Sequence, residues 1–524
     1  MAEHVEKTDR QTSYILKAVI DIGSTSIRMV VAQIHEDGRF QMLDSLHQSV
    51  AIGRDTFTRS RITRTTVEDA VKVLRSFSTI LREYNIDLRT DVRAVATSAV
   101  REARNRIEFL DRVYIATGIN VEIIDGSEVN RLTYLGIRPL LQKNAVLREN
   151  RLLVVEVGGG STELLGIDNG SVSFAHTYRM GSYRLREKME QRAADLSSKA
   201  VLESEIDSAV RQLRETVDGD EQETALLLLG SEARLTARFL LKDWDESTLA
   251  RIRISELSKL AASVSGMDAE QIALKYKISF EEAQTLGPSL QIHTRLARTF
   301  GLRQVFVCGV TLREGLLAET ALGNVWAADF VEQILHSAKE IGKKYEAHQP
   351  HAECVARHAR AIFLALEREH QLEYRYEIIL AVAAQLHDIG MFISNAGHHK
   401  HSQYLILNSD IFGLGREDIR LVAMVARYHR RALPGTSHLD YAALSREDRL
   451  VVNKLAAILR VADALDRTHT ETIRDIKVIP EEDQVLIEIR GRNDLVTEKR
   501  ALSEKGVMFE QVYGRPIVLR SKRK

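Results

Sequence analysis

The sequence predicts an α/β protein with two similar halves around a cleft, followed by an all-α domain and a small α+β C-terminal domain. Segments 17–34 and 151–168 each read as strand, glycine-containing turn and strand, and aligning Asp21 with Glu156 superimposes the two segments. Strand and helix patterns alternate to about residue 320. From there to about residue 470 the pattern is helical, and strands return after it. We therefore expect four domains, at 14–134, 135–324, 325–470 and 471–524.

Apolar periodicity and β-branched runs predict the elements of the two halves. The first half should have helices over 65–84 and 105–117, and strands over 92–97 and 121–125. The second half should have a helix over 202–217, strands over 225–229 and 305–308, a helical region over 254–298, and a helix that begins near Leu312.

The rest of the chain changes its pattern twice. Helical periodicity predicts helices over 327–345, 351–366, 374–387, 416–429 and 450–469. Two strands, a helix and a last strand follow, over 476–480, 485–490, 495–509 and 516–519. These last elements form the predicted α+β domain.

Composition excludes several classes of protein. The 524 residues contain 73 basic and 73 acidic side chains, which excludes a uniformly basic nucleic-acid binder and an acidic disordered tail protein. The basic side chains are 53 Arg and 20 Lys, and the Arg fork matches phosphate oxygens. Only Cys308 and Cys354 occur, and no apolar run approaches about 18 residues. We therefore expect a soluble, cytoplasmic protein with no membrane span and no nucleic-acid partner.

The two glycine-containing turns are candidate phosphate sites. Small residues after a strand leave backbone N–H groups exposed to an anion, and Gly158-Gly159-Gly160 meets that need. A plain hairpin turn explains this triplet equally well. The duplication favours the phosphate site, because each turn follows an acid and the two halves should face each other. Asp21, Glu156 and Glu163 could then hold a hydrated Mg²⁺.

Several motifs in order resemble the exopolyphosphatase and guanosine pentaphosphate phosphohydrolase (Ppx/GppA) family. They are DIGSTSIRMVV at Asp21, ATSAVREARN at Ala96, IIDGSEVNRLTYLG at Ile123, EVGGGSTEL at Glu156, RMGSYRL at Arg179 and LREGLL at Leu312. The resemblance implies two ribonuclease-H-like halves of the actin-like ATPase superfamily. It also implies Mg²⁺-dependent hydrolysis of a terminal phosphoanhydride, processive on polyphosphate, and a homodimer.

The resemblance also implies roles for individual residues. Glu128 matches the family's catalytic glutamate, Arg101 its phosphate-contacting arginine, and Asp21, Glu156 and Glu163 its metal- and water-binding acids. The phosphate-binding positions are Gly23, Ser24, Thr25, Gly158, Gly159, Gly160, Ser161 and Thr162.

This chain departs from the family pattern at several of these places. The family usually has Asp at the position of Glu156, Asn at that of Thr25, and a second Glu followed by Ala at those of Val129 and Asn130. A longer carboxylate arm moves a metal ligand unless the backbone compensates. These departures bear on efficiency, metal preference and choice of substrate.

The predicted all-α domain resembles the HD metal-dependent phosphohydrolase domain of longer family members. The resemblance implies a metal site of His351, His387, Asp388 and Asp463, on separate helices, with His399 and His429 as further contacts. Imidazole and carboxylate ligands together suit Mn, Fe, Zn or Mg. The alternative is that these histidines only satisfy hydrogen bonds in the core.

The leading hypothesis is therefore a metal-dependent exopolyphosphatase. Three alternatives stand beside it. One is hydrolysis of the 5′-γ-phosphate of guanosine pentaphosphate. Another is a low-turnover protein that binds and senses polyphosphate or a nucleotide. The third is an ATP-dependent kinase-like enzyme, which the motifs around Arg101 and Glu128 disfavour.

Overall fold

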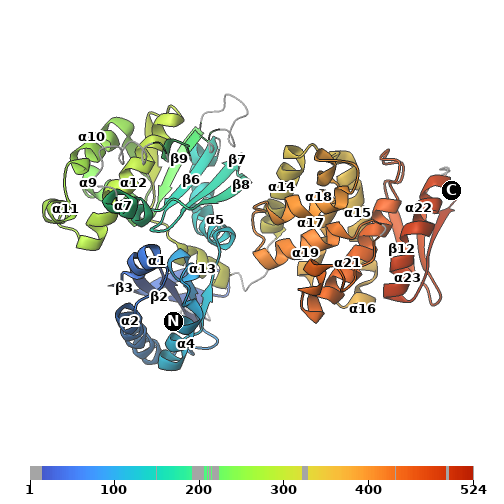
Figure 1. The fold of residues 1–524 in the computed structure, drawn as a ribbon, viewed down its shortest axis with the longest axis horizontal. Helices are drawn as coiled ribbons and strands as arrows, with labels where there is room; N and C mark the ends of the chain where they lie inside the picture. Colours follow the sequence, from blue (N-terminus) through green and yellow to red (C-terminus); the bar gives the residue numbers. More distant parts are fainter. Residues whose placement is uncertain are drawn as a thin grey trace, which may run out of the picture. The chain divides into compact units, whose positions relative to one another are not determined.

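The computed structural model describes residues 14–148, 150–191, 224–321, 328–430, 432–490 and 495–522, with isolated positions between 204 and 214 (Figure 1). The chain forms two compact units. Unit 1 comprises residues up to Val325 except Val172–Phe174, and unit 2 comprises those three residues with Trp326–Lys524. The finer division into four domains stays a prediction. The helix predicted over 202–217 lies outside the residues described as continuous structure.

Unit 1 contains two mixed sheets. The first has the order β3-β2-β1-β4-β5. Its strands are β1 (Tyr14–Ile22), β2 (Ser26–His35), β3 (Phe40–Ser49), β4 (Val92–Ala96) and β5 (Val121–Ile123). β2 is antiparallel to β1 and β3, whereas β4 is parallel to β1 and β5. The predicted first hairpin and the two later strands are therefore confirmed, and the central strand β1 ends at the turn that follows Asp21.

The second sheet repeats this arrangement. Its order is β10-β11-β9-β6-β7-β8. The strands are β6 (Arg151–Val157), β7 (Thr162–Asp168), β8 (Ser171–Tyr178), β9 (Thr224–Leu229), β10 (Ala250–Arg253) and β11 (Gln304–Val307). β6 is antiparallel to β7 and parallel to β9, and β9 is parallel to β11. The strand order β3-β2-β1-β4-β5 thus recurs as β8-β7-β6-β9-β11.

The repeat extends to the hydrogen bonds of the two turns. The Gly23 N–H donates to the Ser26 carbonyl at 3.0 Å, and the Gly158 N–H donates to the Ser161 carbonyl at 2.8 Å. Aligning Asp21 with Glu156 places the donor and the acceptor of the second bond on those of the first. The repeat predicted from the sequence is therefore present in the backbone.

Helices cover both faces of the first sheet. They are α1 (Ile52–Arg59), α2 (Arg64–Glu83), α3 (Ser98–Arg101), α4 (Arg106–Thr117), α5 (Gly126–Lys143) and α13 (Leu312–Ala321). Ile20 of β1 packs in one core with α2 and α4, whereas the next residue back, Val19, packs in another with α5 and α13. Adjacent strand residues point to opposite faces, so consecutive buried residues require cover on both sides.

The remaining described helices of unit 1 belong to the second half: α6 (Ala145–Arg148), α7 (Ser182–Gln191), α9 (Ser231–Leu240), α10 (Ile254–Ser265), α11 (Ala269–Tyr276) and α12 (Phe280–Thr299). Sequence analysis missed β3, which is an edge strand with mainly exposed or half-buried polar residues. It also missed β8 and the short β10. β3 and β8 are mainly exposed or half-buried, and β10 alternates buried and exposed residues over only four positions, which is too short for the pattern to be recognised.

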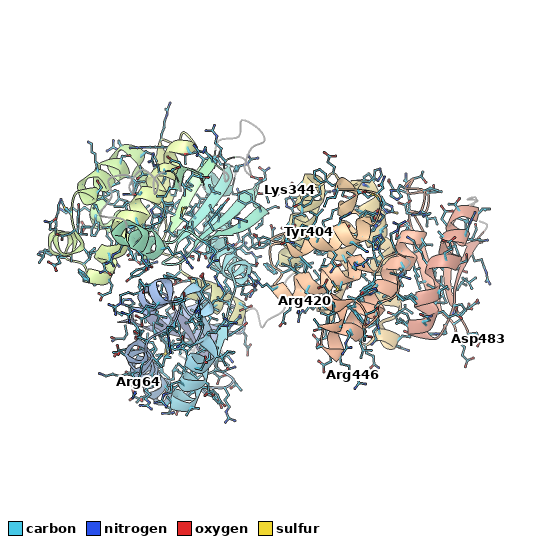
Figure 2. The ribbon with its side chains drawn as sticks, in the orientation of Figure 1. Arg64, Lys344, Tyr404, Arg420, Arg446 and Asp483 are labelled. Atoms are coloured by element: carbon cyan, nitrogen blue, oxygen red, sulfur yellow. The ribbon has the colours of Figure 1, made fainter. Side chains whose placement is uncertain are left out.

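Unit 2 is a helical bundle with a three-stranded sheet. Its helices are α14 (Ala328–Lys344), α15 (Gln349–Ala365), α16 (Glu367–His370), α17 (Tyr374–Leu386), α18 (His398–Leu407), α19 (Arg416–Arg427), α20 (Leu439–Ala442) and α21 (Arg446–Ala464), with a 3₁₀ turn, η1 (Ile389–Phe392). α17 is the central helix and contacts α14, α15, α19 and α21. Figure 2 shows the side chains of both units on this ribbon. The five predicted helices are confirmed.

The sheet of unit 2 has the order β12-β13-β14. Its strands are β12 (Ile476–Pro480), β13 (Val485–Arg490) and β14 (Ile517–Lys522). The single helix predicted over 495–509 is instead two helices, α22 (Val496–Lys505) and α23 (Val507–Tyr513), which meet at Gly506. Among the helices described in the two units, none is long and apolar enough to cross a membrane.

Candidate functional site

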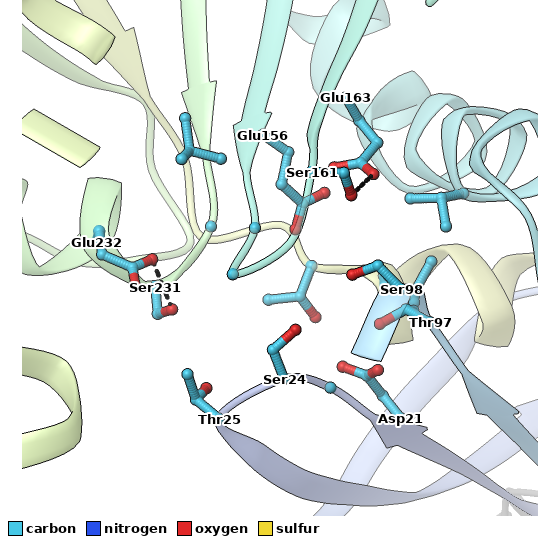
Figure 3. A pocket seen from close by; sticks show the side chains of 18 of the residues that line it. Asp21, Ser24, Thr25, Thr97, Ser98, Glu156, Ser161, Glu163, Ser231 and Glu232 are labelled. Atoms are coloured by element: carbon cyan, nitrogen blue, oxygen red, sulfur yellow. Dashed lines mark hydrogen bonds between the residues drawn. The ribbon is translucent and has the colours of Figure 1, made fainter. Parts of the chain in front are cut away.

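A pocket of about 110 Å³ in unit 1 lies at the two repeated turns (Figure 3). Its lining includes Asp21, Gly23, Ser24, Thr25, Arg101, Glu156, Gly158, Gly159, Ser161 and Glu163. The structure thus brings together ten of the residues that sequence analysis selected. Gly160 and Thr162 belong to the same turn but are not among the lining residues.

Two of the three glycines are required by close packing around the second turn. A Cβ added at Gly159 would lie 2.7 Å from the Cβ of Ser24 in the other turn. A Cβ added at Gly160 would lie 2.3 Å from the ring of Phe57 on α1. Both approaches are closer than side chains can make, so only glycine lets the turns meet at the pocket.

The second turn is held from behind by the start of α7. The carbonyls of Gly158, Gly159 and Gly160 accept hydrogen bonds from the Ser182 N–H, the Tyr183 N–H and the Arg184 Nε, at 2.9, 3.0 and 2.6 Å. In a planar trans peptide the following N–H points opposite to the carbonyl. Three successive N–H groups therefore point away from α7, an arrangement that can bind an anion.

We predict that Gly181→Ala destabilises this turn. An added Cβ would lie 2.3 Å from the Gly159 carbonyl oxygen, a backbone atom that cannot rotate away. Overpacking of this kind costs about 2 kcal/mol, so the thermal unfolding midpoint of unit 1 should fall. Gly266→Ala is the matched control, because nothing lies within 4 Å of a Cβ added there. Equal midpoints for the two variants in calorimetry would contradict the prediction.

Four carboxylates and three arginine side chains line the pocket: Asp21, Glu156, Glu163 and Glu232, with Arg28, Arg101 and Arg234. Burial, and then the charges of Glu163 and Asp21, raise the pKa of Glu156 to about 7. Burial also raises the pKa of Asp21, against the charges of Arg28 and Arg313. Figure 3 shows the Asp21 and Glu156 carboxylates extending into the same space.

Burial raises the pKa of Asp21, Glu156 and Glu163 and so disfavours their ionised forms, which a bound cation would stabilise. Mg²⁺ keeps several waters and needs only one or two direct carboxylates. Asp21, Glu156 and Glu163 supply the oxygen ligands that it prefers. The tightly spaced groups of candidate ligands, in the part of the chain that the structure describes, all lie in unit 2.

Glu163 and Arg101 also line the pocket. Glu163 is 8% exposed and accepts a hydrogen bond from the Ser161 hydroxyl at 2.6 Å. Burial raises the pKa of Glu163, while Ser161 and the charge of Arg101 oppose the rise. Arg101 ends α3 and its Nη1 donates to the Ile124 carbonyl at 2.6 Å, which fixes the guanidinium at the pocket.

The structure does not bring Glu128 to this pocket. Its carboxylate accepts two hydrogen bonds from Arg131, at 2.7 and 2.6 Å, and lies 3.3 Å from Nη2 of Arg93. Burial alone would raise the pKa of Glu128, but Arg131 and then Arg93 outweigh burial and hold this pKa below its usual range. The next residue on α5, Val129, lines the pocket instead.

Sequence analysis missed a second cavity beside the first. It has a volume of about 230 Å³, and its lining includes Arg28, Ser231, Arg234, Arg238 and Arg313. Arg28, Ser231 and Arg234 line both cavities. The sequence did contain one indication that Arg28 belongs to the site. The alignment that superimposes the two hairpins places Arg28 at the position of Glu163, which was selected as a site residue.

Unit 2 gathers the other predicted residues at one buried cluster. His351, His387 and Asp463 form one group of closely spaced ligand atoms, Asp388, His398 and His429 form a second, and His351, Asp388 and His469 form a third. Except for His469, which follows α21, these residues come from α15, the end of α17, α18, the end of α19 and α21. His398 was not selected from the sequence, whereas His399, which was, is absent from these groups.

Comparison with known proteins agrees with this architecture. The family model described as "Ppx/GppA phosphatase family" matches residues 30–323, and "Ppx/GppA phosphatase, domain III" matches residues 335–508. The guanosine-5′-triphosphate,3′-diphosphate pyrophosphatase of Photobacterium profundum is 25% identical, over 85% of this chain and 86% of that protein. The protein of the same name from Aliivibrio fischeri is 24% identical, over 92% of this chain and 90% of that protein.

Solved structures show the same fold in unit 1. An exopolyphosphatase from Cytophaga hutchinsonii has a TM-score of 0.51 and 19% identity, over 59% of this chain and 98% of that chain. An exopolyphosphatase-like protein has a TM-score of 0.52 and 22% identity, over 59% of this chain and 98% of that chain.

Proposed function

Because the chain belongs to the Ppx/GppA phosphatase family, whose members hydrolyse phosphoanhydrides, we propose that it is a metal-dependent exopolyphosphatase. In this proposal unit 1 removes the terminal phosphate from inorganic polyphosphate. The two halves are expected to be ribonuclease-H-like and actin-like, as the shared strand order of the two sheets suggests. A homodimer in the cytoplasm is part of the proposal, and sedimentation velocity would test the dimer.

The observation that carries the proposal is the pair of adjoining cavities. The pocket at the turns has the size and the N–H groups for one phosphate, with Arg101 beside them. The neighbouring cavity adds Arg238 and Arg313 to the shared Arg28 and Arg234, so its four arginines outnumber Glu246 and Glu282 in the same lining. A single phosphate would not need this second basic cavity, whereas a chain of phosphates would extend into it.

Each part of the pocket then has a task in hydrolysis. The turns bind the terminal phosphate, and Arg101 offsets charge on its oxygens. A Mg²⁺ ion held by Asp21, Glu156 and Glu163 would neutralise phosphate charge. The carboxylates at this pocket also orient the attacking water. Water oxygen bonds to the terminal phosphorus, the bridging P–O bond breaks, and the products are phosphate and a chain shortened by one unit.

A second substrate is guanosine pentaphosphate, which has a 5′-triphosphate with the same terminal bond. The support for this substrate is the two full-length relatives, which are both named guanosine-5′-triphosphate,3′-diphosphate pyrophosphatase. A third candidate function is a binding protein with low turnover. The position of Glu128 outside the pocket, and of Val129 at its lining, supports this reading.

The deciding experiment measures phosphate release from long-chain polyphosphate and from guanosine pentaphosphate, with Mg²⁺. Faster release from polyphosphate, by kcat/KM, supports the exopolyphosphatase proposal. Faster release from guanosine pentaphosphate favours the second substrate. Tight binding of either compound, without release above the background of Asp21→Asn, contradicts the hydrolase and leaves the binding protein.

We predict that Arg234→Gln weakens use of long polyphosphate. Arg234 is largely buried and lines both cavities, and its Nη1 atom has no hydrogen-bond partner. Loss of one charge-assisted phosphate contact should raise KM about tenfold with little change in kcat. Arg64→Gln is the control, because Arg64 is 92% exposed, pairs with Glu68 on the same helix and lines neither cavity. Equal KM values for the two variants would contradict the prediction.

A further inference from the structure

The second cavity of unit 1 contains a histidine that has no role in the proposed reaction. His47 and Ser45 lie on the edge strand β3, and both line this cavity. Residues two apart on a strand point to the same face, so these two side chains reach the cavity together. In the sheet, His47 pairs directly with Arg28 of β2, which lines the same cavity. His47 is exposed, so a ligand in the cavity can reach it.

His47 faces a cluster of positive charges. Burial, and then the charge of Arg28, lower the pKa of His47. Arg313 on α13 and Arg234 on α9 lower this pKa further. Like charges directly opposite each other in a sheet are destabilising, so the arginines favour the neutral imidazole. His47 is therefore a neutral residue in a positively charged cavity near pH 7.

The two acids of the cavity do not balance this cluster. Glu282 opposes the arginines, but its carboxylate accepts hydrogen bonds from the N–H and the hydroxyl of Ser279 at the start of α12, at 3.0 and 2.9 Å. Glu246 pairs with Arg238 and lies 3.7 Å from Nε of Arg234. Two carboxylates thus face four guanidinium groups, and the cavity keeps a net positive charge.

The arginines of the cavity also repel one another. Burial, and then the charge of Arg28, lower the pKa of Arg234, and Arg313 adds to this effect. One buried nitrogen of Arg234, Nη1, has no hydrogen-bond partner. A polyanion would relieve the repulsion and supply the missing acceptor, because guanidinium groups match phosphate oxygens.

We propose that His47 is a phosphate-binding residue that takes up a proton when a polyphosphate chain enters the second cavity. This inference rests on the proposed function, in which polyphosphate extends from the turns into that cavity. Phosphate oxygens there would neutralise the arginines and place negative charge beside the imidazole. The pKa of His47 then rises, and a proton from solvent adds to the unprotonated ring nitrogen. The imidazolium donates that proton in a hydrogen bond to a phosphate oxygen.

Proton uptake makes the binding of polyphosphate depend on pH. The bound state holds more protons than the free state, so affinity rises as the pH falls. Removal of the imidazole should abolish this part of the pH dependence. We expect the ratio of KM at pH 8 to KM at pH 6 to be about fivefold larger for the parent protein than for His47→Gln, with little difference in kcat.

Titration calorimetry counts the proton directly. Long-chain polyphosphate is titrated at about pH 6.5 into the full chain carrying Glu163→Gln, in a chelator, so that polyphosphate is not hydrolysed. The same titration in two buffers with different ionisation enthalpies gives the number of protons taken up. We expect this number to fall by about half a proton when His47→Gln is added. Glu156 and the phosphates also titrate, but they do so in both proteins.

Two further variants serve as controls. His47→Lys has a permanent positive charge, so its KM should be low at both pH values and its proton uptake should equal that of His47→Gln. His176→Gln is the matched control. His176 is an exposed histidine on β8, the edge strand at the same place in the second sheet, and it lines neither cavity. Its proton uptake should equal that of the Glu163→Gln protein.

The outcomes separate this inference from the proposed function. Equal proton uptake with and without His47→Gln, when both proteins bind polyphosphate and have the same thermal midpoint, overturns the role of His47 and leaves the proposed function intact. Lower proton uptake in His176→Gln as well as in His47→Gln also overturns that role. Absence of both polyphosphate binding and phosphate release in the parent protein overturns the proposed function, and this inference with it.

Discussion

Glu163→Gln is expected to lower kcat/KM for phosphate release by about a thousandfold or more, whereas Glu128→Gln should keep it within about tenfold of the parent protein. Glu163 is buried at the pocket, next to the phosphate turn, where loss of a carboxylate removes both cation binding and water orientation. Glu128 lies outside the lining residues, and Arg131 and Arg93 occupy its oxygens.

The comparison reverses the expectation from the family motif, in which Glu128 is the catalytic residue. Initial rates are measured with polyphosphate and with guanosine pentaphosphate at saturating Mg²⁺, so that the outcome does not depend on the choice of substrate. Separate values of KM and kcat for each variant distinguish weaker substrate binding from a slower chemical step. A large loss of kcat in Glu128→Gln, with a normal rate in Glu163→Gln, would restore the motif assignment.

The sequence could not decide whether Glu128 or its neighbour Val129 faces the pocket, because a shift of one residue along a helix turns a different side chain toward it. Consecutive residues on an α-helix differ in direction by about 100°. The side chain of Asp125 caps the helix by accepting from the Glu128 N–H at 3.0 Å, and this start directs Val129 to the pocket. Spacing in the motif places both residues near the pocket but does not say which faces it. His398 and His399 present the same problem at the start of α18.

The repeated hairpins were predictable because a strong local pattern occurs twice. β-Branched runs on both sides of a glycine turn specify strand, turn and strand, and aligning Asp21 with Glu156 relates the two copies. Arg234 and Arg238 were not predictable in the same way. They lie on α9, a helix without a phosphate motif, and only the tertiary fold brings them to Arg28 and Arg313.

The metal-free protein is expected to lose stability as the pH rises from about 4.5 to about 7, through Glu156. The pKa of Glu156 is 4.5 in the unfolded chain and about 7 in the folded one. Between these values the unfolded state has released the proton and the folded state has not, so stability falls with pH. The difference corresponds to about 3 kcal/mol, and we expect about 2 kcal/mol because the side chain lines an open pocket.

Glu156→Gln removes this titration. In a chelator at pH 8 its thermal midpoint should therefore exceed that of the parent protein, whereas at pH 4.5 the two should agree. Mg²⁺ should raise the midpoint of the parent protein at pH 8 and raise that of Glu156→Gln less, because a cation stabilises the ionised carboxylates. Calorimetric scans across this pH range, with and without Mg²⁺, provide the measurement.

Glu128→Gln serves as the control, because it should lower the thermal midpoint at pH 8, whereas Glu156→Gln should raise it. A lowered pKa means that the folded state holds the ionised form more strongly, so Glu128 contributes stability above about pH 4.5 and loses it in acid. Replacing it leaves Arg93 and Arg131 without this partner at pH 8 and should lower the midpoint. If both variants shift the midpoint in the same direction at pH 8 without metal, the pocket does not carry the excess negative charge on which the Mg²⁺ proposal depends.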